Sequence, residues 1–103
     1  MKLVNDTNTT VEINGLGACE FIAITKLEEM AVLHLENMMD SIDIIIDINA
    51  DITIQTIEKG AFDPNWVTVE QTNVKSLKES DFDLMCFINQ KLGQHKIGFS
   101  FTF

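Results

Sequence analysis

Carboxylates are the side chains of this sequence best suited to chemistry, and they are concentrated in one third of the chain. Between residues 27 and 58 there are eight acidic residues and neither a lysine nor an arginine. They are Glu28, Glu29, Glu36, Asp40, Asp43, Asp47, Asp51 and Glu58. Because the whole chain has a net charge of −9, this segment accounts for nearly all of it. A catalytic carboxylate is recognised by surroundings that raise its pKa, and the sequence marks no residue in that way.

One run of oxygen-bearing side chains has the spacing of a calcium-binding loop. Positions 1, 3, 5, 7, 9 and 12 of an EF-hand would be occupied by Asp47, Asn49, Asp51, Thr53, Gln55 and Glu58. Position 6 is Ile52, although the sharp turn of the loop requires glycine there. The flanking residues alternate as strands do, whereas the motif needs helices. We therefore expect no metal site, apart from a weak cation contact of Asp47 and Asp51 if a hairpin brings them together.

The histidines, cysteines and glycines carry no stronger signature. Cys19 and Cys86 are far apart, so we expect free, buried thiols in a reducing compartment. His34 falls on an apolar stripe and His95 in a polar connection, without the spacing of a zinc site. Residues 15–17 begin like a dinucleotide-binding turn, but a predicted strand follows where a helix would be needed. The sequence predicts no catalytic residue and no cofactor, so we expect a protein that is not an enzyme.

The composition is typical of one globular domain. With 103 residues, 46% hydrophobic and 22% charged, we expect residues 1–103 to form a single domain. The absence of arginine and the net charge of −9 argue against direct contact with nucleic acid, because phosphates would repel the chain. No run of residues has the length of a signal-peptide core or a membrane span, so the sequence predicts a cytoplasmic protein without membrane contacts.

The first half of the sequence predicts three strands and a helix. Residues 2–5 and 9–14 are β-prone and flank a turn, which predicts a hairpin, and residues 18–25 predict a third strand. Thr25 and Glu28 have capping-box spacing, so a helix is predicted from there to about Asp40. Its apolar stripe has helical spacing. The stripe consists of Leu27, Met30, Ala31, His34, Leu35 and Met38.

After this helix the hydrophobic period changes to two. Isoleucine recurs at alternate positions from residue 42 to residue 54, with Ala50 as the one exception, which predicts β-structure. One strand over the whole run would be long, so a hairpin is the favoured interpretation and a single strand the alternative. A three-residue loop at residues 49–51 would pair Ile48 with Ile52 and keep the isoleucines on one face.

The second half of the sequence predicts two more strands and a second helix. Residues 66–72 alternate as a strand, and residues 80–92 predict a helix with Gly93 following its end. Residues 97–103 alternate phenylalanine and isoleucine with small residues, which predicts a closing strand. The predicted fold is α+β, a mainly antiparallel sheet of five to seven strands with two helices, in the order β-β-β-α-β-β-β-α-β.

The acidic segment should form a surface, because both of its predicted elements bury an apolar side. Glu29, Glu36 and Asp40 would share the solvent side of the first helix, and exposed aliphatic residues within such a patch are typical of a docking surface. A merely solubilising face is the alternative, although such faces normally contain lysines. The residues expected to bind a partner are Glu29, Val32, Leu33, Glu36, Asp40, Asp43, Asp47 and Asp51.

These features predict a non-enzymatic acidic protein that binds a basic surface of another protein, and a nucleic-acid-binding protein is the predicted partner. Such a protein could inhibit its partner by occupying the nucleic-acid groove. Phage anti-defence proteins of the anti-CRISPR kind often share this size and acidity, a similarity of composition only. The alternative is a structural or assembly protein that forms homo-oligomers through sheet edges, with Phe99, Phe101 and Phe103 on the closing strand.

Overall fold

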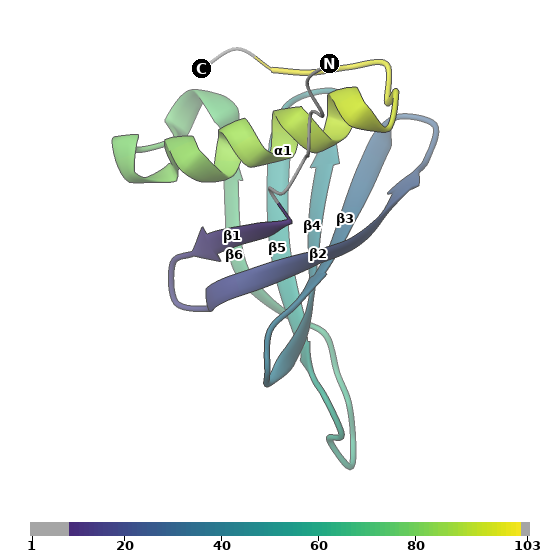
Figure 1. The fold of residues 1–103 in the computed structure, drawn as a ribbon, viewed down its shortest axis with the longest axis vertical. Helices are drawn as coiled ribbons and strands as arrows, with labels where there is room; N and C mark the ends of the chain where they lie inside the picture. The colour runs from purple at the N-terminus through teal and green to yellow at the C-terminus, as the bar shows by residue number, and fades with distance from the viewer. Residues whose placement is uncertain (1–8, 102–103) are drawn as a thin grey trace, which may run out of the picture.

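The protein folds as a curled antiparallel sheet of six strands followed by a helix (Figure 1). The structure is a computed structural model and describes residues 9–101. Each strand pairs with its neighbour in sequence, so the sheet order is β1-β2-β3-β4-β5-β6. The strands are β1 (Thr10–Ile13), β2 (Gly17–Lys26), β3 (Met30–Glu36), β4 (Asp40–Asp47), β5 (Asp51–Glu58) and β6 (Val67–Asn73). Two short 3₁₀ segments, η1 (Val74–Ser76) and η2 (Glu79–Asp81), lead into α1 (Phe82–Gln94).

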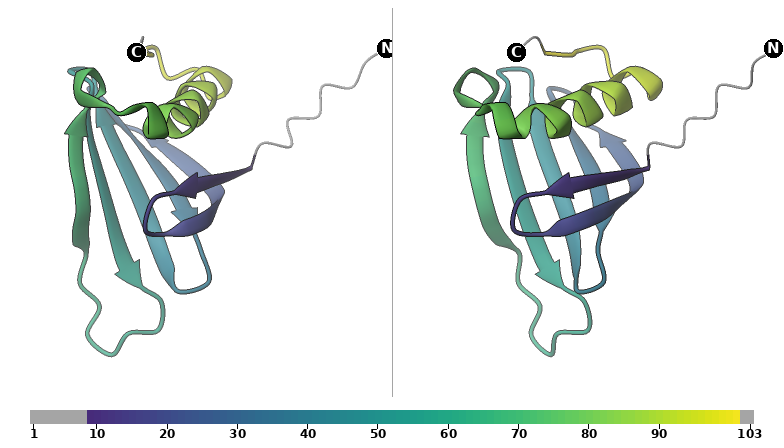
Figure 2. Two further views of the ribbon diagram at one scale, coloured as in Figure 1. Left: turned by 90° about the vertical axis from the view of Figure 1, so that its left-hand side faces the viewer. Right: turned by 60° about the vertical axis from the view of Figure 1, so that its left-hand side comes forward.

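The hydrophobic core lies between the concave face of the sheet and α1. The β1–β2 hairpin curls in front of the later strands, and α1 crosses one end of the enclosed face (Figure 2). Alternate residues of β3, β4 and β5 point into this core, and α1 contributes Met85, Phe87, Ile88 and Leu92. Lys91 is also buried there, with Nζ 4.9 Å from the ring centroid of Phe21, so a cation–π contact accompanies its burial.

The helix predicted to end near Asp40 is wrong, because its central residues form β3. Ala31, Leu33 and Leu35 are buried in the core, while the residues between them are half-buried on the other face. The segment satisfies both periods, since Ala31 and Leu35 also have helical spacing. Pairing with β2 on one side and β4 on the other satisfies the backbone of the segment and buries Leu33 together with Ala31 and Leu35. The domain is therefore α+β with one α-helix among its described residues.

The isoleucine-rich run is a hairpin, as the sequence predicted, but its register differs. The loop comprises Ile48, Asn49 and Ala50, so Ile46 pairs with Ile52. The Asp47 carboxylate accepts hydrogen bonds from the backbone amides of Asn49 (2.9 Å) and Asp51 (3.1 Å), which fixes the loop one residue earlier than expected. The shift moves Ile48 out of the core, so that 49% of it is exposed. The isoleucines that stay on the buried face are Ile42, Ile44, Ile46, Ile52 and Ile54.

The C-terminal part of the chain is helical where predicted but has no closing strand in its described residues. The predicted helix is α1, which extends two residues beyond Leu92. Residues 97–101 are not a strand, because the backbone of Phe101 donates to the Asn89 side chain at 3.0 Å and accepts from it at 2.6 Å. Phe99 and Phe101 pack against the core. Residues 102–103 and the predicted strand at residues 2–5 lie outside the described residues.

Of the remaining predicted strands, three are confirmed. Residues 9–14 correspond to β1, which pairs with β2, the strand predicted over residues 18–25. Residues 66–72 correspond to β6. All three are bounded by turn residues in the sequence, and this is why their positions could be recognised.

The loop between β4 and β5 provides a test of this hairpin geometry. Ala50 has φ of 67°, a left-handed conformation that costs a residue with a Cβ roughly 1–2 kcal/mol, and glycine is preferred at this position of a three-residue hairpin. We expect Ala50→Gly to raise the free energy of unfolding by about 1 kcal/mol in a urea titration. The control is Ala23→Gly within β2, which should lower it. A loss of stability in both variants would contradict the assigned loop.

Candidate functional site

The residues predicted to bind a partner do not form one surface. Leu33 was expected to be exposed, but it is 0% exposed, because neighbouring residues of a strand point to opposite faces. Glu29 lies in the β2–β3 turn and Asp40 at the start of β4, on the side of the inward-pointing isoleucines. The convex face of the sheet carries the other five residues. These are Val32, Glu36, Asp43, Asp47 and Asp51.

Each of the four carboxylates among these residues has a partner within the fold. Glu36 forms an ion pair with Lys59 at 2.9 Å, and Asp43 contacts the His34 ring at 2.8 Å. Asp47 binds the backbone of its own hairpin loop, and Asp51 accepts a hydrogen bond from the Asn73 side chain at 2.9 Å. The contacts of Asp43 and Asp51 join neighbouring strands, whereas those of Glu36 and Asp47 hold loops at the strand ends. The convex acidic face is therefore partly accounted for by the structure of the sheet itself.

The residues with the spacing of a calcium-binding loop belong to the β4–β5 hairpin. Residues 51–58 are the extended strand β5, so their side chains alternate between two faces and do not curl around a common centre. Within residues 9–101, no group of three or more histidine, cysteine, aspartate or glutamate side chains is arranged to hold a metal ion.

A hydrogen-bonded row of Thr25, His34 and Asp43 crosses three strands of the convex face. His34 Nδ1 lies 2.8 Å from Asp43 Oδ1, and His34 Nε2 lies 2.7 Å from Thr25 Oγ1. A carboxylate only accepts, so Nδ1 donates to Asp43 and, in a neutral ring, Nε2 accepts from Thr25. The sequence missed this row because His34 was assigned to a helix. Alternation in residues 30–36 was the signal that could have revealed it.

The row has the connectivity of a hydroxyl–histidine–carboxylate triad but not the surroundings of one. A nucleophilic hydroxyl needs donors aimed at the developing oxyanion and a site that excludes water. Thr25 is exposed within a strand, and α1 lies on the opposite face of the sheet. The adjacent hollow is open, and its lining includes Ile22, His34, Asp43 and Trp66 but not Thr25. The row is best explained as a cross-strand stabiliser.

We expect the free energy of unfolding to fall by roughly 0.5–1.5 kcal/mol for each hydrogen bond of the row that is lost, which is one bond in Thr25→Val and two in His34→Gln. A double-mutant cycle measured by urea unfolding should give a coupling between them. Hydrolysis of p-nitrophenyl acetate should proceed at the same rate with the wild type and Thr25→Val. A rate that drops with Thr25→Val and with His34→Gln would instead identify a catalytic hydroxyl.

Two loops at the end of the sheet away from α1 carry the most exposed of the large apolar side chains among the described residues. The β3–β4 turn carries Met38, 94% exposed, and Met39, while Phe62 is fully exposed in the long β5–β6 loop. Figure 1 shows both loops at the bottom of the molecule, with the β5–β6 loop extending furthest. We name this region the loop-end surface. It comprises Met38, Met39 and Phe62 with the neighbouring carboxylates of Glu36, Asp40, Glu58 and Asp63.

Lys59 holds the two loops of this surface together. Its backbone amide donates to the Met39 carbonyl at 2.9 Å, and its ammonium group donates to the Asn37 carbonyl at 2.8 Å while pairing with Glu36. The Asn37 side chain caps the β3–β4 turn by accepting from the amides of Met39 and Asp40. The backbone of the β3–β4 turn is therefore held in place, and the start of the β5–β6 loop is joined to it.

Like charges face each other across the strands at this end. Asp40 is directly opposite Glu58, and Glu20 is directly opposite Glu36. Such pairs repel, so they destabilise a sheet by up to about 1 kcal/mol each. Lys59 neutralises Glu36, whereas Asp40 and Glu58 remain a pair of adjacent negative charges. This arrangement costs stability and concentrates negative potential beside Phe62 and the methionines.

Relieving this repulsion should stabilise the protein. We expect Glu58→Gln to raise the free energy of unfolding by roughly 0.2–1 kcal/mol at low ionic strength, and the gain should shrink in 1 M salt because of screening. Glu70→Gln is the matched control, since Glu70 faces Ile54 across the strand and not a carboxylate. An equal gain in both variants would assign the effect to overall net charge.

Comparison with known proteins assigns no relative: no protein-family model, curated protein or solved structure matches this chain. A further property can be read directly from the fold. No helix within residues 9–101 has the length and apolar character needed to cross a membrane.

Proposed function

We propose that this protein is a non-enzymatic binding protein whose loop-end surface engages a basic surface of another protein. The observation that carries the proposal is the exposure of Met38 and Phe62 within a set of carboxylates that repel one another. Exposed apolar side chains surrounded by charge are typical of interaction sites. A repulsive pair that lowers stability is a feature expected where function requires it.

In the proposed mechanism, charge speeds association and apolar contact slows dissociation. The net charge of −9 attracts a cationic partner over roughly one Debye length, which raises the association rate. On contact, lysine or arginine side chains of the partner would neutralise Asp40 and Glu58 and so remove their repulsion. Phe62 and Met38 would then become buried and slow dissociation, as interface anchors do.

The partner we propose is a nucleic-acid-binding protein, because a groove that binds phosphates is a basic surface of the required kind. Carboxylates on adjacent strands could occupy the positions of backbone phosphates, so the protein would act as an inhibitor by charge mimicry. The absence of arginine and the excess of acids support this role over direct nucleic-acid binding. An anti-defence role like that of anti-CRISPR proteins remains a proposal from composition.

The test is to capture partners from host lysate, purify those retained, and measure their affinities and association rates by biolayer interferometry. We expect Met38→Ala with Phe62→Ala to weaken affinity at least about tenfold through faster dissociation. Asp40→Lys with Glu58→Lys should lower the association rate and flatten its dependence on salt.

The matched control is Glu28→Lys with Glu29→Lys, which changes the same amount of charge in the β2–β3 turn at the opposite end of the sheet. Circular dichroism checks that each variant folds. An equal loss of binding in the control would reduce the effect to net charge, and wild-type affinity in both loop-end variants would refute the proposal.

The alternative is assembly through sheet edges, which was predicted on a closing strand at residues 97–103. The described part of this segment is not a strand. Phe99 and Phe101 pack against the core and do not form an edge strand. Light scattering over a range of concentrations tests self-association directly.

A further inference from the structure

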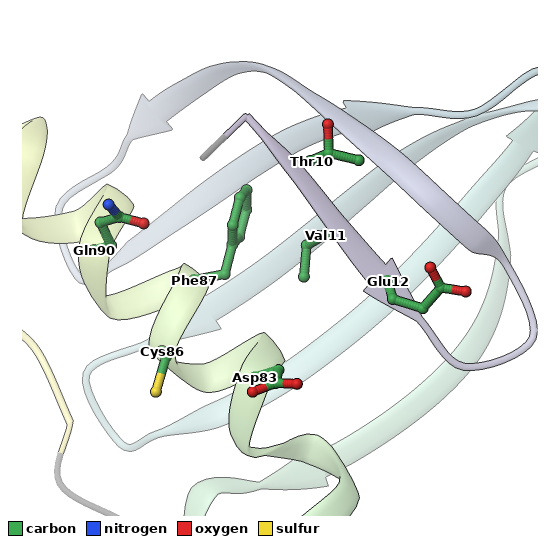
Figure 3. A pocket seen from close by; sticks show the side chains of 7 residues that line it. All are labelled: Thr10, Val11, Glu12, Asp83, Cys86, Phe87 and Gln90. Carbon is green, nitrogen blue, oxygen red and sulfur yellow. The ribbon is translucent and has the colours of Figure 1, made fainter. Parts of the chain in front are cut away.

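A groove separates the edge strand β1 from α1, at a different place from the loop-end surface. Its volume is about 500 Å³. Thr10, Val11 and Glu12 line it from the strand, and four residues of α1 line it from the helix (Figure 3). These are Asp83, Cys86, Phe87 and Gln90, which recur at the three- and four-residue spacing of one helix face.

The strand side of the groove is an unpaired sheet edge. In the described residues β1 pairs only with β2. The amide of Phe21 donates to the Thr9 carbonyl, so the backbone groups of Thr9, Val11 and Ile13 point toward β2. In an antiparallel ladder the residues between them point the other way. The backbone N–H and C=O groups of Thr10 and Glu12 therefore face away from β2, toward the open edge of the sheet.

The groove combines an apolar floor with an acidic rim. Val11 and Phe87 are buried and belong to the hydrophobic core, whereas Glu12 and Asp83 are exposed, one on each side. No lysine is among the residues that line the groove. An occupant with positive charges would thus meet a carboxylate on either wall, and an acidic one would be repelled from both.

We propose that the groove binds an extended basic segment of another protein, which adds to the sheet as a strand beside β1. Its backbone would pair with the outward groups of Thr10 and Glu12 over about four residues, the length of β1. Side chains of a strand alternate between two faces. Lysines or arginines on one face would lie beside Glu12, and apolar residues on the other would meet Phe87. The proposal does not depend on the loop-end surface.

Cys86 provides a reporter for this site. Cys86 is exposed in the groove, so its predicted burial is wrong, whereas Cys19 is buried as predicted and burial raises the pKa of the Cys19 thiol to about 11. Because the thiolate is the reactive form, a maleimide at pH 7 should label Cys86 and leave Cys19 unmodified. The labelling rate of Cys86, followed by mass spectrometry, therefore measures whether the groove is covered.

The probe is a blocked peptide of about six residues in which lysine and valine alternate. We expect it to slow Cys86 labelling at least about tenfold at saturation. Two control peptides isolate the mechanism: one with glutamate in place of lysine, and one with lysines kept but alternate backbone amides methylated on the pairing edge. Neither control should protect Cys86. Equal protection by the methylated peptide would overturn strand addition, since only electrostatic adsorption would remain.

Protein variants separate this site from the loop-end surface. Thr10→Pro removes an outward amide without touching the β1–β2 ladder, a position where edge strands tolerate proline, and should weaken the peptide at least about tenfold. Glu12→Lys with Asp83→Lys should do the same, whereas Asp40→Lys with Glu58→Lys should retain most of the affinity. If Thr10→Pro does not fold, the methylated peptide still tests whether the backbone of the peptide pairs with β1. Concentration-dependent protection of Cys86 without peptide would identify a second copy of the chain as the occupant and overturn the proposal.

Discussion

The fold depends on the antiparallel pairing of β3, β4 and β5, whose inward side chains form continuous rows across the sheet. In register, these rows are Ala31–Ile46–Ile52, Leu33–Ile44–Ile54 and Leu35–Ile42–Thr56. Every member is buried, and each fully buried aliphatic side chain contributes roughly 1.5–3 kcal/mol. The β1–β2 hairpin and α1 close over these rows. The groove lies where α1 and β1 meet in that closure.

Much of the fold could be predicted where one period dominates. The hairpin of β4 and β5 has little helical character, and α1 has no competing alternation, so both were recognised. Residues 30–36 fit either period, and only the partner strands on both sides decide between them. That error also misplaced Leu33. The predicted helix put it on the solvent side, whereas in a strand it points to the same face as Ala31 and Leu35, into the core. The register of the hairpin depended on the Asp47 side chain, which periodicity does not describe.

The acidity of the chain could be read from the sequence, but the arrangement of its carboxylates on the fold could not. The excess of carboxylates was evident, but four of them hold strands or turns, through His34, Lys59, the β4–β5 loop and Asn73. Phe62 was the overlooked signal: a phenylalanine between Gly60 and Pro64, in a turn-forming stretch, has no strand or helix face to bury it. The segment without lysine ends at Glu58, and the next residue, Lys59, forms an ion pair with Glu36 of that segment.

The strand order has a consequence for how the chain folds. Since every strand pairs with its neighbour in sequence, most contacts close short loops, and a topology of this kind is expected to fold fast for a β-rich protein. The sheet can grow strand by strand during synthesis. The contact between β1 and α1 joins the two ends of the chain and needs the helix to be complete. Until then one side of the isoleucine rows stays open to water, which makes α1 the element that protects a nascent sheet from aggregation.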